Sequence, residues 1–164
     1  MRSTLLAAFV VGALALGAAA PAVAQPAPVY SLSADSNKTF LADNARKKGV
    51  VVLPSGLQYR VITQGRGLKV ASSMDKVTVA YKGWLITGHV FDQSLQGKPA
   101  RFQPSGLIRG WSEALQRMRE GDEWELVVPS ALAYGANGAG NGIIPPNQTL
   151  VFDLQVIGVE PAAP

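Results

Sequence analysis

The sequence contains no cysteine and only one histidine, His89, in 164 residues. A disulfide framework and a thiolate metal site are therefore impossible, and a histidine cluster of the kind that holds zinc cannot form. Asp92 and Ser94 lie near His89 along the chain, but no Gly-x-Ser-x-Gly motif accompanies them, so we do not expect nucleophilic catalysis. The protein is predicted to act without a metal or a cofactor.

Charge is also sparse, because Asp, Glu, Lys and Arg make up 16% of the chain and its net charge is +4. The basic residues are interspersed with acids and form no run longer than Arg46-Lys47-Lys48. The glycines between 135 and 142 lead to Ile-Ile-Pro-Pro and not to a helix start, which disfavours a phosphate-binding loop. We expect no nucleic-acid partner and no nucleotide site.

A long hydrophobic run occurs only at the amino terminus. It extends over residues 5–20, follows Arg2 and precedes Ala22-Val23-Ala24, which is the order of an export signal with a cleavage site before Gln25. The alternative is a membrane anchor, but a membrane-spanning helix needs about 20 apolar residues. The prediction is a signal peptide over 1–24, no membrane span after its removal, and a location in the periplasm or, alternatively, outside the cell.

The remaining chain divides into a leader and one domain. Residues 25–55 are predicted to be a flexible leader with a short helix at about 36–48, capped by Ser36 or Asn37 and ended by Gly49. Residues 56–160 are predicted to form the functional domain. Its alternating apolar residues indicate strands around 57–62, 76–82, 123–128 and 150–156, with a hairpin at Thr87-Gly88.

A single helical period in this domain covers 111–119. The fold class is therefore predicted to be α+β, with a twisted antiparallel β-sheet of about five strands, one face of it wet, wrapped around one short α-helix. The segment 133–147 is too long and too rich in glycine for a simple connection, which is typical of a functional loop. Six aromatic residues stand where predicted strands or loops end: Tyr81, Phe91, Phe102, Trp111, Tyr134 and Phe152.

Six motifs, in this order and spacing, resemble the signatures of the FK506-binding proteins, a family of peptidyl-prolyl cis-trans isomerases. They are Val79-Ala80-Tyr81-Lys82-Gly83, Val90-Phe91-Asp92-Gln93-Ser94, Leu107-Ile108-Arg109-Gly110-Trp111, Glu120-Gly121-Asp122, Ala133-Tyr134-Gly135 and the segment 142–152. The segment 54–59 further resembles the bacterial branch typified by the macrophage infectivity potentiator. The long dimerisation domain of that branch would be represented here only by 36–48, so we expect a monomer.

The resemblance implies an apolar pocket that holds proline. Trp111 would form the floor, Asp92 would lie at the rim near Tyr81, and the Tyr134 hydroxyl and Ile108 backbone N–H would bind substrate carbonyls. The residues to which it assigns a catalytic role are Tyr81, Phe91, Asp92, Trp111, Tyr134 and Phe152. Those to which it assigns substrate binding are Phe102, Leu107, Ile108, Ile143 and Ile144.

The activity implied is cis/trans rotation about the bond preceding proline in exported proteins, assisting their folding. Proline-containing segments would be the partners, and FK506-like macrolides would be possible ligands. Ala100 stands where many relatives have a further wall aromatic, and the overhanging loop is one residue longer than usual. The alternative is a chaperone that holds unfolded chains in the same pocket, with catalysis incidental.

Overall fold

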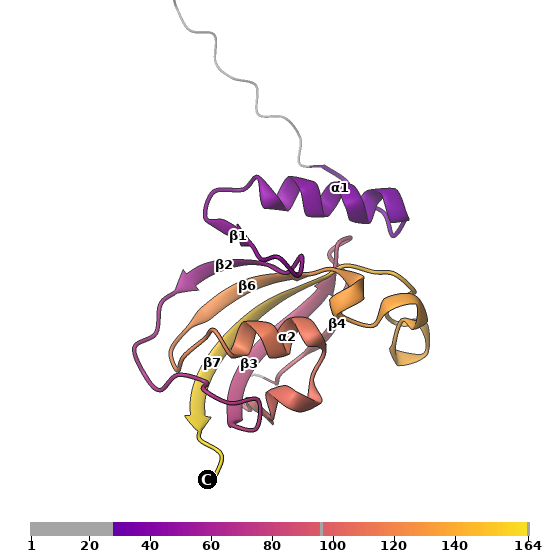
Figure 1. The fold of residues 1–164 in the computed structure, drawn as a ribbon. Helices are drawn as coiled ribbons and strands as arrows, with labels where there is room; N and C mark the ends of the chain where they lie inside the picture. Colours follow the sequence, from indigo (N-terminus) through magenta and orange to yellow (C-terminus); the bar gives the residue numbers. More distant parts are fainter. Residues whose placement is uncertain (1–27, 96, 164) are drawn as a thin grey trace, which may run out of the picture.

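The computed structural model describes residues 28–95 and 97–163 of the chain, so the predicted signal peptide lies outside the described residues (Figure 1). In this part of the chain, seven strands form one antiparallel sheet with the order β1-β2-β6-β7-β3-β4, and β5 pairs with β3. The strands are β1 (Val50–Val52), β2 (Gln58–Thr63), β3 (Lys76–Leu85), β4 (Val90–Gln93), β5 (Ala100–Phe102), β6 (Glu123–Val128) and β7 (Leu150–Glu160). The two α-helices are α1 (Ala34–Ala45) and α2 (Arg109–Leu115).

The α+β class is confirmed, with seven strands in place of about five. The additional strands are short, and three or four residues give no clear alternation in the sequence. Strand β3 is long enough to pair along one edge with two of them. Its first half, Val77–Val79, pairs with β5, and its second half, Lys82–Trp84, pairs with β4 across a register shift. The predicted hairpin is present and joins the antiparallel strands β3 and β4. Gly88 adopts the positive φ, 88°, that its tight turn requires.

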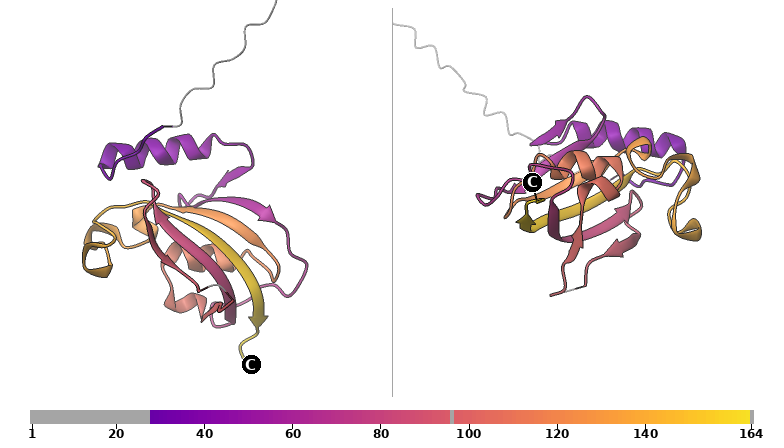
Figure 2. Two further views of the ribbon diagram at one scale, coloured as in Figure 1. Left: turned by 180° about the vertical axis from the view of Figure 1, so that it is seen from behind. Right: turned by 60° about the horizontal axis from the view of Figure 1, so that its bottom comes forward.

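Helix α2 packs against one face of the sheet (Figures 1 and 2). Trp111, Ala114 and Leu115 are buried there in the hydrophobic core. Gly110 permits this contact, because a Cβ at that position would lie 2.4 Å from Val128 Cγ1. The helix occupies 109–115 and not the predicted 111–119, since the chain turns after Leu115 toward Gly121, where φ is 90°.

The opposite face of the sheet is only partly wet. Directly paired residues of antiparallel strands lie on the same face, and the pairs Val127–Val151 and Val151–Trp84 place these three residues on the face away from α2. Val127 and Val151 are nevertheless buried. The neighbouring row across the sheet contains Glu125 and Asp153 and is the polar part of this face. The expectation of one wet face therefore holds for only part of it.

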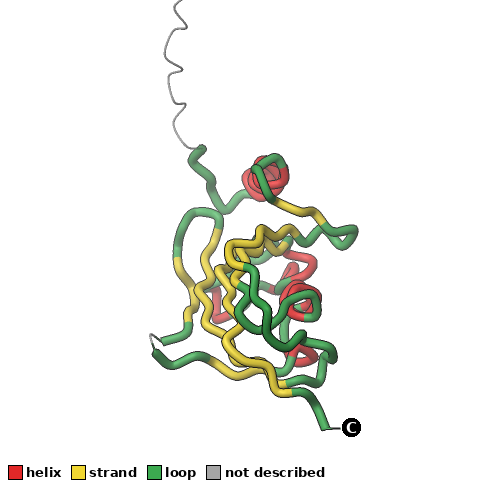
Figure 3. Tube along the Cα trace, turned by 90° about the vertical axis from the view of Figure 1, so that its left-hand side faces the viewer, coloured by secondary structure: helices red, strands yellow, loops and turns green. Residues whose placement is uncertain are grey.

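Helix α1 lies across the end of the sheet at which β7 begins, away from α2 (Figures 1 and 3). It begins earlier than the predicted 36–48, because the Ser33 side chain caps it by accepting a hydrogen bond from the Ser36 backbone N–H at 3.1 Å. Its buried residues are polar, Asn37 and Asn44, and no apolar stripe is buried. Neither α1 nor α2, the α-helices of the described ranges, is long and apolar enough to cross a membrane.

Candidate functional site

A cavity of about 250 Å³ lies between the start of α2 and the face of the sheet on which α2 packs. Residues from β3, β4, β5, α2, β7 and two connecting segments meet in it. They are Tyr81, Phe91, Asp92, Phe102, Gly106, Leu107, Ile108, Trp111, Tyr134 and Phe152. The structure thus brings together all six residues predicted to be catalytic, together with three of the five predicted to bind substrate.

Trp111 forms the floor of the cavity. Only 4% of its surface is exposed, because α2 presses it against the sheet. The rings of Tyr81 and Phe152 each stand nearly perpendicular to the indole, with centroids 5.2 Å away, and Phe102 stands in the same way at 6.1 Å. Edge-to-face contacts of this kind fix each ring through its neighbours. These rings form an aromatic box around part of the cavity.

Gly83 allows the walls of this box to close. Phe91 and Phe152 meet edge to face with centroids 5.6 Å apart, and a Cβ at Gly83 would lie 2.7 Å from atoms of both rings. No side chain other than hydrogen fits under them. Sequence reasoning placed Gly83 in a motif but assigned it no role, and a glycine in the interior of a strand was the available signal.

Asp92 and Tyr81 form the polar rim. The Tyr81 hydroxyl donates a hydrogen bond of 2.8 Å to Asp92 Oδ2. Burial, followed by this bond and the charge of Asp92, raises the pKa of Tyr81 to about 12. Burial and the charge of Asp92 also raise the pKa of Tyr134. Both hydroxyls therefore remain protonated donors at neutral pH and well above it.

Two donors without an internal partner belong to residues that line the cavity. Within residues 28–95 and 97–163, neither the Ile108 backbone N–H nor the Tyr134 hydroxyl donates to a protein acceptor. Ile108 stands just before α2, and Tyr134 lies 41% exposed at the start of the glycine-rich loop. These groups belong to different elements that line the same cavity, and both are available as donors to a ligand.

Ile143 and Ile144 do not line this cavity. They line a smaller adjoining hollow of about 190 Å³, which shares Phe91, Asp92 and Tyr134 with it. Ile144 is buried, whereas Ile143 is 55% exposed. The hollow extends the cavity toward the glycine-rich loop.

Gly106 lines the cavity and was missed by sequence reasoning, because it precedes the recognised motif and carries no side chain. The indole N–H of Trp111 is buried and has no hydrogen-bond partner among the described residues. Ala100 does not line the cavity, although it belongs to the neighbouring strand β5.

The site has the character of a class of protein: an apolar ligand site lined by aromatic side chains, with polar groups at its rim. Comparison with known proteins gives the family. A family model described as FKBP-type peptidyl-prolyl cis-trans isomerase matches residues 68–157, and one described as the domain amino terminal to FKBP-type peptidyl-prolyl isomerase matches residues 18–61. The chain belongs to the FKBP-type peptidyl-prolyl cis-trans isomerase family, as its motifs indicated.

Individual proteins of this family are similar to the chain in sequence. The chain is 50% identical over 139 residues to the outer membrane protein MIP of Legionella longbeachae, covering 82% of this chain and 59% of that protein. It is 49% identical over 121 residues to the FKBP-type 22 kDa peptidyl-prolyl cis-trans isomerase of Escherichia coli, covering 73% and 58%. The chain therefore spans somewhat over half of the length of these curated relatives.

Solved structures show the same fold. A peptidyl-prolyl cis-trans isomerase from Pseudomonas syringae is 40% identical, with a TM-score of 0.72, covering 77% of this chain and 92% of that one. FkpA from Escherichia coli is 41% identical, with a TM-score of 0.73, covering 79% and 60%. The resemblance to the bacterial branch of the family is thereby confirmed.

Proposed function

We propose that this chain catalyses cis/trans rotation about the peptide bond preceding proline, and so assists the folding of exported proteins. The observation that carries the proposal is the cavity itself. Trp111 and the rings perpendicular to it accept a pyrrolidine ring, while the Ile108 N–H and Tyr134 hydroxyl are available to the adjoining carbonyls.

The reaction needs no nucleophile. The planar bond is held by resonance with a barrier of roughly 18–20 kcal/mol. As the bond twists, the nitrogen regains its lone pair and the carbonyl oxygen loses negative charge, so the twisted state is less polar than the planar one. An apolar cavity that removes water from the carbonyl therefore favours the twisted state, and fixed donors position the chain. Lowering the barrier by about 5–7 kcal/mol gives an acceleration of about 10⁴–10⁵-fold.

The roles proposed for the residues follow from their places. Trp111, Tyr81, Phe91 and Phe152 enclose the ring, and Tyr134 positions a carbonyl. Asp92 acts on Tyr81 through their hydrogen bond and adds negative charge at the rim. The remaining proposed contacts are made by Phe102, Leu107, Ile108, Ile143 and Ile144.

A proline-limited refolding assay, run beside an aggregation assay, tests the proposal. Uncatalysed proline isomerisation takes tens of seconds or more at 25 °C, so its acceleration is easily resolved. We expect the slow refolding phase to become faster in proportion to the enzyme concentration. Suppressed aggregation with an unaltered slow phase would instead identify a chaperone that only holds its clients.

FK506-like macrolides are proposed as ligands of the same cavity, because an apolar ring of a macrolide can take the place of proline. Competitive inhibition of peptide isomerisation by FK506 measures this. Inhibition that leaves KM unchanged would place the macrolide elsewhere.

A monomer is proposed as the functional state. The face of α1 that carries Asn37 and Asn44 is engaged by the chain's own Gln148, Thr149 and Gln58, so it is not available to a second copy. Light scattering at micromolar concentration should give the monomer mass. A persistent dimer would contradict this.

Export with cleavage before Gln25, and a periplasmic location, are proposed from the sequence, and the name of the Legionella relative as an outer membrane protein supports an envelope location. The intact mass of protein from the exported fraction tests the cleavage. A mass that retains residues 5–20 would contradict it.

A further inference from the structure

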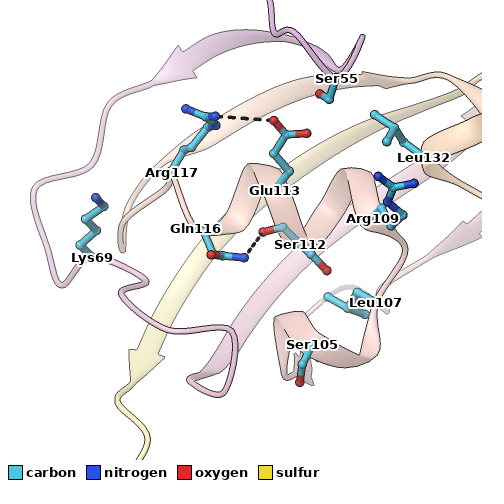
Figure 4. Close-up of a pocket in the computed structure, with 10 residues that line it drawn as sticks. All are labelled: Ser55, Lys69, Ser105, Leu107, Arg109, Ser112, Glu113, Gln116, Arg117 and Leu132. Atoms are coloured by element: carbon cyan, nitrogen blue, oxygen red, sulfur yellow. Dashed lines mark hydrogen bonds and ion pairs between the residues drawn. The ribbon is translucent and has the colours of Figure 1, made fainter.

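A second hollow, larger than the aromatic cavity, opens on the solvent side of α2. Its volume is about 850 Å³, against about 250 Å³ for the cavity. We call it the α2 groove. The residues that line it are Ser55, Lys69, Ser105, Leu107, Arg109, Ser112, Glu113, Gln116, Arg117 and Leu132 (Figure 4).

The periodicity of α2 explains why one helix serves both the core and the groove. Trp111, Ala114 and Leu115 turn toward the sheet and are buried. Arg109, Ser112, Glu113 and Gln116 stand three or four positions apart, so they share the other face of the helix and line the groove. Both sets of side chains project from the same short helix. The orientation of Trp111 in the aromatic cavity therefore also determines which side chains line the groove.

The charge of the groove is mainly positive. Lys69, Arg109 and Arg117 line it, against one carboxylate, Glu113. The Arg117 guanidinium lies 3.5 Å from the Glu113 carboxylate and so compensates it. Lys69 and Arg109 are exposed and form no ion pair with any residue in the described ranges. Two uncompensated cations thus remain to attract an anionic ligand.

The groove adjoins the proline cavity. Leu107 lines both hollows, and Arg109 follows directly after Ile108, which lines the cavity. A chain whose carbonyl is held by Ile108 therefore leaves the cavity beside Leu107 and Arg109. Three residues of extended chain reach about 10 Å, and the seven residues of α2 also have a length of about 10 Å. A flank of about three residues is therefore long enough to lie along α2.

We propose that the α2 groove binds the client segment that flanks the isomerised proline, and that Lys69 and Arg109 make it select acidic residues in that segment. The inference rests on the proposed isomerase function. It adds a preference for clients that carry Asp or Glu within about three to five residues of the proline, on the side that leaves the cavity at Ile108.

The experiment compares peptides that share one central segment, which contains the proline. A flank of three residues, placed either before or after this segment, consists of Glu, Gln or Lys, and the peptides are otherwise identical. We expect kcat/KM for the Glu flank on one side to exceed that for the Gln flank by roughly two- to tenfold at low salt, because exposed ion pairs contribute modestly. The Lys flank should be poorer than the Gln flank. Both differences should shrink at about 0.5 M salt, where the charges are screened.

The double variant Lys69→Gln, Arg109→Gln should bring the ratio of Glu-flank to Gln-flank kcat/KM close to one. The matched control, Lys38→Gln with Lys48→Gln, removes two exposed lysines from the leader and should retain the wild-type ratio. A wild-type ratio of one on both sides, or a preference that survives the groove variant, would overturn the inference. Failure of the wild type to isomerise even the Gln-flank peptide would instead overturn the proposed function.

Discussion

Asn37 and Thr149 are 112 positions apart in the sequence, and the Thr149 backbone N–H donates a buried hydrogen bond of 2.7 Å to Asn37 Oδ1. Asn37 Nδ2 also donates to Gln148 Oε1 at 3.1 Å. Gln148 and Thr149 directly follow the glycine-rich loop, which closes on itself where the Asn147 N–H donates to the Gly135 carbonyl at 2.7 Å. Helix α1 is therefore tied to the loop that begins with Tyr134.

Asn37→Leu should lower the free energy of unfolding by about 1–3 kcal/mol, because the buried Thr149 N–H and Gln148 amide would lose their partner. We also expect KM for a proline peptide to rise, since the anchor of the loop that carries Tyr134 is lost. Chemical denaturation and peptide kinetics at a temperature where the variant is folded measure the two effects. Lys38→Leu, at the exposed neighbouring position, is the control. An Asn37→Leu protein with wild-type stability would show that the tie contributes little.

This tie could not be predicted from the sequence. Asn37 and Asn44 are polar, so on a lone helix they argue against a buried face. The sequence predicts only a short helix within a flexible leader. Their partners, Thr149 and Gln58, lie 112 and 14 positions away in the sequence, and strand β1 stands between the helix and Gln58. Burial of a polar helix face depends on tertiary hydrogen bonds, which leave no periodic signal.

The aromatic site was more accessible to sequence reasoning. Trp111 and Phe152 fall in recognisable motifs, and the strands that carry Tyr81 and Phe152 alternate clearly enough to be predicted. The reason is physical. A large apolar side chain indicates burial by its chemistry. Strand β5, with three residues, is too short to show an alternating pattern, and Gly106 has no side chain that could mark it as part of the site. The groove residue Arg109 was seen only as part of a motif, because nothing local shows which way a helix will face.

Tyr81→Phe should reduce kcat/KM severalfold while leaving the melting temperature nearly unchanged. The substitution removes the hydroxyl that donates to Asp92 at the exposed rim and keeps the ring that packs against Trp111. Peptide isomerisation and thermal unfolding provide the two readouts. Tyr59→Phe is the matched control, since Tyr59 stacks on Trp124 and does not line the cavity. Full activity of Tyr81→Phe would remove the rim from the proposed site.

Gly83→Ala should lower kcat/KM by about tenfold or more and also reduce stability by about 1–3 kcal/mol, as overpacking does. The new methyl group would lie 2.7 Å from ring atoms of both Phe91 and Phe152, so at least one wall must move. Gly158→Ala, in the same sheet, is the control, because its Cβ would lie at an ordinary 3.8 Å from Thr78. Equal activities of the two variants would mean that the position of these walls does not limit catalysis.

The pH dependence separates rotation driven by desolvation from proton transfer. Burial raises the pKa of Tyr134 above its usual value and that of Tyr81 to about 12, so both hydroxyls remain protonated through about pH 9. An imidazole is the side chain that ordinarily changes charge near neutrality, but His89, the chain's only one, stands at the exposed β3–β4 turn and does not line the cavity. We therefore expect kcat/KM to be nearly flat from about pH 6 to 9.

Stability should behave differently at higher pH. A tyrosine whose pKa is raised by folding stabilises the folded state below its unfolded pKa of about 10, and this contribution is lost as the pH rises toward the folded value. Thermal unfolding should therefore show a falling melting temperature above about pH 10, and Tyr81→Phe should reduce that fall.

The flat kcat/KM profile is tested with wild type and His89→Ala, using a peptide whose own isomerisation is independent of pH. A bell-shaped kcat/KM profile near neutrality that His89→Ala flattens would show that an acid–base group takes part in the reaction, and rotation by desolvation alone would then be wrong.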